Sequence, residues 1–286
     1  MKISLGPRLF FPGLIFSIIL TVFPLLYTIY LSFDLATPGA TEYVLSLRHY
    51  FLMFSDFRFW NGLINTVKFV VPTITLQLIL GFGIANLLNQ KLRGKRLAQT
   101  IILIPMITTP IVAVLMWKIL VDPTLGVYST LLEMIGIGPF SWLGSPSLAM
   151  VTVILVDVWQ WTPFMVIVLL AGIQSLPKEP FEAAKLDGAS IFAVTRYITL
   201  PLLAPLFLIL VVLRGTFSIL AFDLLYGLTR GGPGYVTETL NLYIYQSAFR
   251  FGKMNYASAM SVIFLLIIVV IIGGLLVRYK SILKVD

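Results

Sequence analysis

Long apolar runs alternate with short polar connections along this chain, and the pattern predicts an all-helical bundle in a membrane. A helix needs roughly 20 residues to cross about 30 Å of hydrocarbon. The first run is too long for a signal-peptide core and lacks a small-residue cleavage pattern, so we expect it to be kept as a span. We predict about six transmembrane helices, near Leu9–Phe33, Ile64–Leu88, Leu97–Val121, Ser147–Ile173, Thr199–Phe222 and Ala257–Tyr279.

The composition agrees with a chain that lies mostly in lipid. The 286 residues are 59% hydrophobic and 11% charged, with a mean hydropathy of +0.99, whereas a soluble domain carries about 25% charged residues. We therefore expect residues 1–286 to form a single transmembrane domain. The chain has no cysteine, and we expect its one histidine, His49, to be a solvated loop residue. Thiolate catalysis and multi-histidine metal sites are excluded.

Basic residues favour one side of this topology, and such residues are enriched in cytoplasmic connections. We therefore expect both termini and the connection between the fourth and fifth spans to be cytoplasmic, in the inner membrane of a prokaryote. This topology explains the net charge of +8 without a nucleic-acid partner, because the charges form no patch with stacking aromatics. The cytoplasmic side carries Lys2, Arg8, Lys91, Arg93, Lys95, Arg96, Lys178, Lys185, Arg196, Arg278, Lys280 and Lys284; the other side carries only Arg48, Arg58, Arg230, Arg250 and Lys253.

The connection between the fourth and fifth spans is polar and prone to form helix. Gly188 can end one short helix in a left-handed conformation, and Ser190 can cap a second one. We therefore predict a helix–glycine–helix element on the cytoplasmic face. Its composition suits an amphipathic connector at the membrane interface, and it also suits a docking element for another protein.

The spacing of residues in this connection is more specific than its composition. Glu182-Ala183-Ala184 is followed after three residues by Gly188, and after nine more by Ile198-x-Leu200-Pro201. This resembles the cytoplasmic coupling loop in the membrane subunits of ATP-driven (ABC) importers, which favours docking over the connector. Thr195 departs from the pattern, because relatives usually carry an aromatic residue there. The resemblance implies that a separate ATPase is contacted by Glu182, Ala183, Ala184, Asp187 and Gly188.

The connection between the fifth and sixth spans carries a second resemblance. Thr229-x-Gly231-Gly232-Pro233 comes before Tyr243-Ile244-Tyr245, and this is similar to the external segment, here about residues 223–256, of permeases of the maltose and glycerol-3-phosphate type. The chain resembles the first permease of such pairs more than the second. A structural cap on the bundle is favoured over direct contact with sugar. The helix face expected to pack on the bundle contains Leu240, Tyr243, Ile244 and Ala248.

Together the two resemblances imply one permease subunit of an ABC sugar importer. Such an assembly contains a second permease, an ATPase dimer and an external solute-binding protein, and it moves a sugar or polyol through the lipid by alternating access. This chain contains no Gly-x-x-x-x-Gly-Lys-Ser/Thr phosphate loop. We therefore expect it to have no catalytic residue, metal site or cofactor of its own, with ATP and Mg²⁺ bound by the partner ATPase.

Two charged residues fall deep inside predicted spans, where a charge is costly and often functional. Asp157 and Arg214 lie about 15 and 12 Å from the outer ends of the fourth and fifth spans. Sugar hydroxyls pair with polar side chains, and sugar C–H faces stack on aromatic rings. A buried pair that only fixes helix packing explains the two charges equally well. The candidate substrate pathway comprises Asp157, Gln160, Trp161, Phe164, Arg214, Phe217 and Ser218.

Three other functions fit the pattern less well. The main alternative is a secondary transporter driven by an ion gradient, which would show carboxylate relays within the spans and often inverted repeats. An intramembrane enzyme would need a nucleophile–base pair or a metal cluster inside the bilayer. A structural scaffold would leave the spacing of the coupling loop unexplained.

Overall fold

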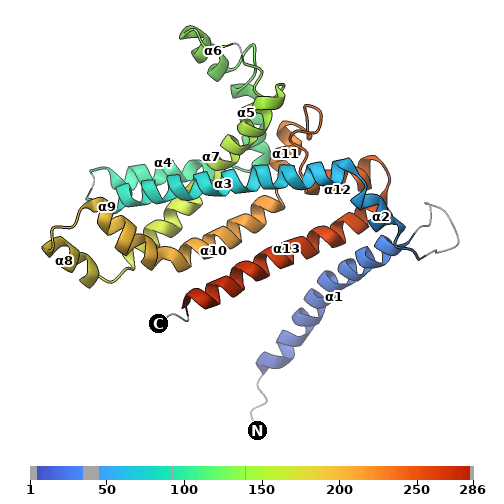
Figure 1. Cartoon of the computed structure of the whole chain (residues 1–286), viewed down its shortest axis with the longest axis horizontal. Coiled ribbons are helices and arrows are strands. Elements are labelled where there is room, and N and C mark those ends of the chain that lie inside the picture. The colour runs from blue at the N-terminus through green and yellow to red at the C-terminus, as the bar shows by residue number, and fades with distance from the viewer. Residues whose placement is uncertain (1–4, 35–44, 92, 139, 284–286) are drawn as a thin grey trace. The chain divides into compact units, whose positions relative to one another are not determined.

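The computed structural model describes residues 5–34, 45–91, 93–138 and 140–283, and nearly all regular structure within them is helical. Lys2 and Lys284, which entered the topology argument, lie outside the described residues. Figure 1 shows and labels the α-helices; two short π-helical turns, which the figure does not label, are named η1 and η2 here. In chain order they are α1 (Leu5–Phe33), α2 (Arg48–Phe54), α3 (Phe57–Asn89), α4 (Lys95–Ile107), α5 (Pro110–Leu120), α6 (Val127–Met134), α7 (Pro146–Gln174), α8 (Glu179–Leu186), α9 (Ile191–Val194), η1 (Thr195–Thr199), α10 (Leu200–Ile219), α11 (Asp223–Leu228), α12 (Leu240–Tyr245), η2 (Gln246–Arg250) and α13 (Met254–Leu283).

The all-helical fold class predicted from the apolar runs is confirmed. Within the described residues, five helical stretches are long and apolar enough to cross a membrane, and a bent pair of helices, α4 and α5, supplies a sixth if it is counted as one span. The five stretches are Phe11–Phe33, Phe57–Asn89, Pro146–Gln174, Ile191–Ile219 and Met254–Val277.

The third predicted span differs from the observed structure, because Leu97–Val121 is not one continuous helix. α4 ends at Ile107, α5 begins at Pro110, and the two axes differ by 97°. Proline forces the residue before it away from the helical region, and Thr109 is accordingly extended, with ψ of 147°. Pro110 itself is tolerated because it starts α5, where its missing N–H has no helical partner to lose. Figure 1 shows the sharp turn between the two helices.

The described chain divides into two compact units, residues 1–60 with 243–270 and residues 61–242 with 271–286. A single transmembrane domain therefore remains a prediction. In the first unit, His49 does not lie in a solvated loop as predicted. It belongs to α2, is half-buried, and its Nε2 lies 3.1 Å from the carbonyl oxygen of Asp34. The reason is local: residues 48–54 form a helix that orients the ring toward the end of α1.

A polar network around Asp56 also lies in the first unit. One carboxylate oxygen, Oδ2, accepts hydrogen bonds from the hydroxyls of Tyr243 and Tyr256, and Oδ1 accepts the backbone N–H of Arg58 at 2.8 Å. Burial raises the pKa of Asp56, but these hydrogen bonds outweigh it and the net pKa is lowered. Burial and the bond to Asp56 raise the pKa of Tyr243 to about 12. The network ties the α2–α3 turn to the external segment and to the start of α13.

The second unit has two apolar clusters that follow one another along α3 and α7. The first cluster includes Phe69, Val153 and Leu225, and the second includes Ala85, Met165 and Leu210. Helices approach closely at the second cluster, since a Cβ on Gly81 would come within 2.6 Å of Met165 Cβ. Because lipid is as apolar as these side chains, close van der Waals packing, rather than their removal from water, holds the helices together at these clusters.

The external segment packs as predicted from its helical spacing. Leu240, Tyr243 and Ala248 are at most 7% exposed, and Ile244 is partly buried. Gly62 of α3 allows this close packing, because a Cβ at that position would lie 3.1 Å from Leu240 Cα. The backbone N–H of Leu240 also donates to Thr66 Oγ1 at 3.0 Å.

Candidate functional site

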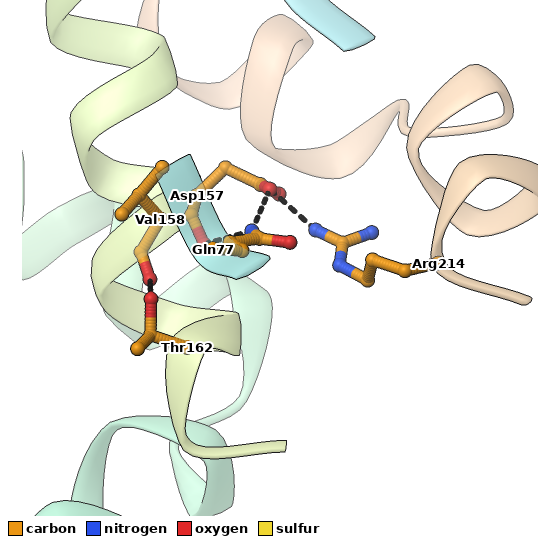
Figure 2. Close-up of polar contacts among 5 residues, drawn as sticks. All are labelled: Gln77, Asp157, Val158, Thr162 and Arg214. Carbon is orange, nitrogen blue, oxygen red and sulfur yellow. Dashed lines mark hydrogen bonds and ion pairs between the residues drawn. The ribbon is translucent and has the colours of Figure 1, made fainter. Parts of the chain in front are cut away.

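A layer of polar side chains separates the two apolar clusters of the second unit. Arg214 of α10 donates through Nη2 to Asp157 Oδ2 of α7, and Gln77 of α3 donates through Nε2 to the same oxygen at 2.9 Å. The Gln77 amide also reaches the carbonyl oxygen of Asp157 at 3.1 Å. Figure 2 shows the three side chains converging from three helices. All three are at most 3% exposed, so the pair is shielded from solvent in this conformation.

The polar layer leaves donors and acceptors unused. Gln77 Oε1, Arg214 Nε and Ser218 Oγ are buried and have no hydrogen-bond partner within the described structure. Ser218 lies one helical turn beyond Arg214 on the same face of α10. A buried polar group without a partner costs free energy, so these atoms favour occupation of the layer by water or by a polar solute in some state of the protein.

Aromatic residues from the predicted pathway are distributed unevenly around this layer. The Arg214 guanidinium lies over the Trp161 ring, with Cζ 5.0 Å from the ring centroid, which is a cation–π geometry. Phe164 is partly buried and packs against the second apolar cluster. Phe217 lies apart from them, because its side chain is 68% exposed while Arg214 and Ser218 on the same helix are buried.

Gln160 has a partner that the sequence did not indicate. Its Nε2 donates to the carbonyl oxygen of Thr108 at 3.1 Å, and Thr108 is the C-cap residue that follows α4. A broken helix leaves carbonyl oxygens without intrahelical donors, and Gln160 satisfies one of them. The buried Gln160 amide thus stabilises the α4–α5 bend, and this structural role does not depend on contact with a solute.

The predicted helix–glycine–helix element is confirmed in the loop between α7 and α10. α8 ends at Leu186, and Gly188 follows with φ of +69°. The N–H of Ala189 donates to Ala184 O at 2.9 Å and that of Gly188 to Lys185 O at 3.3 Å, which is the Schellman arrangement. Ser190 Oγ then accepts the N–H of Ala193 at 3.2 Å and caps α9, as expected.

The residues assigned to coupling are mostly on the surface of this loop. Glu182, Ala183, Asp187 and Gly188 are exposed, whereas Ala184 is 8% exposed and faces inward. Sequence reasoning missed the large apolar side chains beside them. Leu186, Ile191 and Phe192 are 89%, 88% and 78% exposed. Figure 1 places α8 and α9 together where the chain turns from α7 to α10.

Gln77 was also missed from the candidate site. The signal was present, because Gln77 is an amide near the middle of the second apolar run, and a polar residue at that depth needs a partner.

A buried polar layer within long apolar helices is typical of a membrane transport protein. The chain belongs to the family described as binding-protein-dependent transport system inner membrane component, whose model matches residues 77–280. It is therefore a multi-pass transport subunit of the ABC importer type and not an enzyme.

Two relatives and one solved structure illustrate the match. The trehalose/maltose transport system permease protein MalF of Thermococcus litoralis is 33% identical over 91% of this chain and 88% of its own length. The sulfoquinovosyl glycerol transport system permease protein SmoG of Agrobacterium fabrum is 32% identical over 88% of this chain and 82% of its own. A chain of a bacterial ABC transporter that imports the acidic polysaccharide alginate has the same fold, with a TM-score of 0.86 at 20% identity, covering 97% of this chain and 95% of that chain.

Proposed function

We propose that this permease carries a di- or oligosaccharide or a related polyol, and that it forms half of the translocation pathway with a second permease. The observation that carries the proposal is the buried layer of Asp157, Arg214 and Gln77 with the Trp161 ring beside it. A carboxylate, an amide and a guanidinium suit hydroxyl groups, and an aromatic face suits the C–H surface of a sugar ring. The printed names of the relatives, which concern trehalose, maltose and sulfoquinovosyl glycerol, support the same class of solute.

The energy for transport comes, in this proposal, from a separate ATPase dimer that binds ATP and Mg²⁺. Its docking site is the exposed loop with Glu182, Ala183, Asp187 and Gly188 at the surface, held in shape by the buried Ala184 and the glycine turn. Relatives usually carry an aromatic residue at the position of Thr195, and in this chain the exposed ring of Phe192 takes the place of that aromatic contact with the ATPase. Closure of the ATPase pair shifts the permeases between inward-open and outward-open states.

An external solute-binding protein delivers the sugar to the face opposite the coupling loop. Both termini of this chain and the coupling loop then lie in the cytoplasm, and the segment at about residues 223–256 lies outside. The distribution of Lys and Arg supports this orientation. A solved structure of an alginate transporter in complex with a periplasmic protein bound to an alginate pentasaccharide illustrates such delivery for that transporter.

The proposal is tested on the reconstituted assembly of both permeases, the ATPase and the binding protein in lipid nanodiscs. We expect ATP hydrolysis to rise when a cognate sugar is added with the binding protein, and amino acids at the same concentration to have no effect. Stimulation by amino acids alone would assign another solute class. Uptake that follows an ion gradient and needs no ATP would instead establish the secondary transporter.

A further inference from the structure

A cavity of about 300 Å³ lies between α5 and α11, apart from the polar layer described above. Its walls include Pro110, Ile111 and Val114 of α5, and Phe222, Asp223 and Tyr226 at the start of α11. Small-molecule sites have volumes of about 300 to 1,000 Å³, so this cavity has room for a single sugar ring rather than for an oligosaccharide.

The aromatic side chains of the cavity form a preformed surface. The rings of Phe222 and Tyr226 stack with centroids 5.1 Å apart and an interplanar angle of 14°. Phe222 is partly buried against the first apolar cluster, which fixes its position, while Tyr226 is exposed. A ring held in place by packing loses little conformational entropy when a ligand stacks on it.

The one charged group of the cavity is available for a ligand. Asp223 is exposed, and its side chain forms no hydrogen bond or ion pair with the described residues. A carboxylate accepts hydrogen bonds only, so it suits paired sugar hydroxyls and repels anionic solutes. A carboxylate next to an aromatic surface suits a neutral carbohydrate. The carboxylate accepts hydrogen bonds from the hydroxyl groups, and the aromatic ring packs against the C–H face of the sugar ring.

Several residues of the cavity lie close in sequence to residues of the polar layer. Phe222 follows Ser218 by four residues, and Arg214 lies a further turn back along α10. Arg214 and Phe222 are eight residues apart, and α10 ends between them at Ile219. Pro110 begins α5, directly after the α4–α5 bend at which Gln160 donates a hydrogen bond to Thr108 O. The cavity residues of α11 thus follow α10, which carries Arg214, closely along the chain, and those of α5 follow the bend that Gln160 of α7 contacts.

We infer that this cavity is an outer subsite that binds one ring of the transported sugar before the solute reaches the polar layer. Phe222 and Tyr226 stack against the ring, and Asp223 accepts hydrogen bonds from its hydroxyls. The close fit of α11 on α5 sets the width of the subsite, since a Cβ on Gly227 would come within 2.8 Å of Val114 Cγ1. The inference rests on the proposed function, because it assumes that the solute is a sugar and enters from this end.

Occupancy can be measured by protection of a single cysteine, because this chain has no native one. The assembled complex with Ile111→Cys is treated with an impermeant thiol reagent in the presence of maltose, trehalose or sucrose, and uptake of the same sugars is measured for the wild type. We expect the sugar that is carried best to slow labelling of Ile111→Cys. It should not slow labelling of Val127→Cys, which is exposed on α6 outside the cavity.

Two further variants test the ligand-binding groups in the Ile111→Cys background. Asp223→Asn should raise the sugar concentration that gives half-protection by about tenfold, since a hydrogen bond to a charged group is lost, and Tyr226→Leu should also raise it. Glu133→Gln and Phe249→Leu serve as controls, because Glu133 is exposed elsewhere and the Phe249 ring packs beside Tyr245, tilted by 39°, at the same four-residue spacing. Neither should change the protection.

The outcomes separate this inference from the proposed function. If the wild type carries a sugar that gives no protection, or if Asp223→Asn leaves half-protection unchanged, the subsite is wrong and the proposed function stands. If Ile111→Cys reacts in the isolated subunit and not in the complex, the partner permease covers the cavity, which also overturns the subsite. If no sugar is carried at all, the proposed function fails, and the subsite fails with it.

Discussion

Asp157 and Arg214 form a buried ion pair although they lie 57 positions apart, and the segment between them includes the exposed α8–α9 loop. The two helices that leave this loop, α7 and α10, are therefore joined again at the polar layer. A movement imposed on the loop acts on the same two helices that hold the pair. This places the candidate docking element and the candidate solute site on one continuous structural unit.

The first prediction separates packing from transport at this pair. Asp157→Asn or Arg214→Gln leaves the other residue buried without its charged partner, which costs about 3 to 5 kcal/mol. We expect each single variant to lower the yield of assembled complex. The double variant should assemble well again but carry sugar poorly, because the groups that bind the solute are gone. Assembly is measured by co-purification and transport by sugar uptake in proteoliposomes.

Gln77→Leu serves as a matched variant for the same layer, since it removes an uncharged partner of Asp157 and leaves the ion pair. Its effect on assembly should be smaller than that of either charge variant. Full transport by a well-assembled Asp157→Asn/Arg214→Gln double variant would remove both residues from the site. The amide and the aromatic residues would then be the remaining candidates.

The second prediction concerns two glycines two residues apart on α3. A methyl group on Gly81 would lie 2.6 Å from Met165 Cβ, whereas one on Gly83 meets nothing within 4 Å. Overpacking costs about 1 to 3 kcal/mol, while alanine in place of an unhindered helical glycine stabilises by about 0.5 to 1 kcal/mol. Gly81→Ala should lower the thermal unfolding midpoint of the purified complex, and Gly83→Ala should hold or raise it. Equal midpoints would contradict the close α3–α7 packing.

The apolar runs were sufficient to predict the long membrane-spanning helices, but not short helices such as α2 or the break between α4 and α5. The run Leu97–Val121 is mostly apolar, and a proline within such a run is compatible with either a kink or a full break. The outcome depends on groups elsewhere in the fold that satisfy the freed backbone. Gln160 donates to Thr108 O across this break, and no local pattern around Thr108 indicates that partner.

The candidate site was predictable from charge and depth, but its orientation was not. α10 carries apolar residues on every side, so hydrophobic periodicity does not indicate which face lies inward. Ser218 is buried and Phe217 is exposed, although they are adjacent in sequence. The coupling loop was predicted best, because glycine and serine there set the backbone directly through φ and a cap rather than through distant packing.

The third prediction is a pH dependence that arises from Asp56. The pKa of Asp56 is lowered from its ordinary value of 3.8 in the folded protein, so its contribution to stability is full above 3.8 and is lost as the pH falls through the lowered pKa. Tyr243 acts in the opposite sense, because its raised pKa of about 12 keeps its contribution full below its ordinary value near 10 and loses it as the pH rises through 12.

Asp56→Asn should therefore reduce the unfolding midpoint at neutral pH, and the difference from the wild type should shrink on acidification. The midpoint is followed by intrinsic fluorescence of the purified subunit between pH 7 and pH 3. Glu133→Gln, at an exposed position of α6, is the control and should show no such convergence. A difference that stays constant over this range would exclude the Asp56 network as its source.

The fourth prediction concerns the side of the membrane on which each loop lies. Ser190 caps α9, and Ser145 precedes α7, at the opposite ends of the segment that contains α7. Single cysteines at these positions can be labelled selectively, since the chain has no native cysteine. An impermeant thiol reagent applied to intact cells should label Ser145→Cys and leave Ser190→Cys unlabelled until the membrane is permeabilised. The reverse pattern would invert the orientation and place the coupling loop outside.

The last prediction tests whether the glycine turn in the α8–α9 loop is needed for coupling rather than for folding. Gly188 and Gly94 share a left-handed backbone, with φ of +69° and +79°, and a Cβ at either position meets nothing within 4 Å. Alanine at each therefore carries the same strain of roughly 1 to 2 kcal/mol, which corresponds to a factor of about 5 to 30 in an equilibrium constant. Only Gly188 belongs to the loop that carries Glu182.

We expect Gly188→Ala to reduce co-purification of the ATPase and sugar uptake together, and Gly94→Ala to leave both near the wild type. Glu182→Lys should reproduce the loss without any backbone strain. If Gly188→Ala and Glu182→Lys both assemble and transport normally, the ATPase docks elsewhere on the chain.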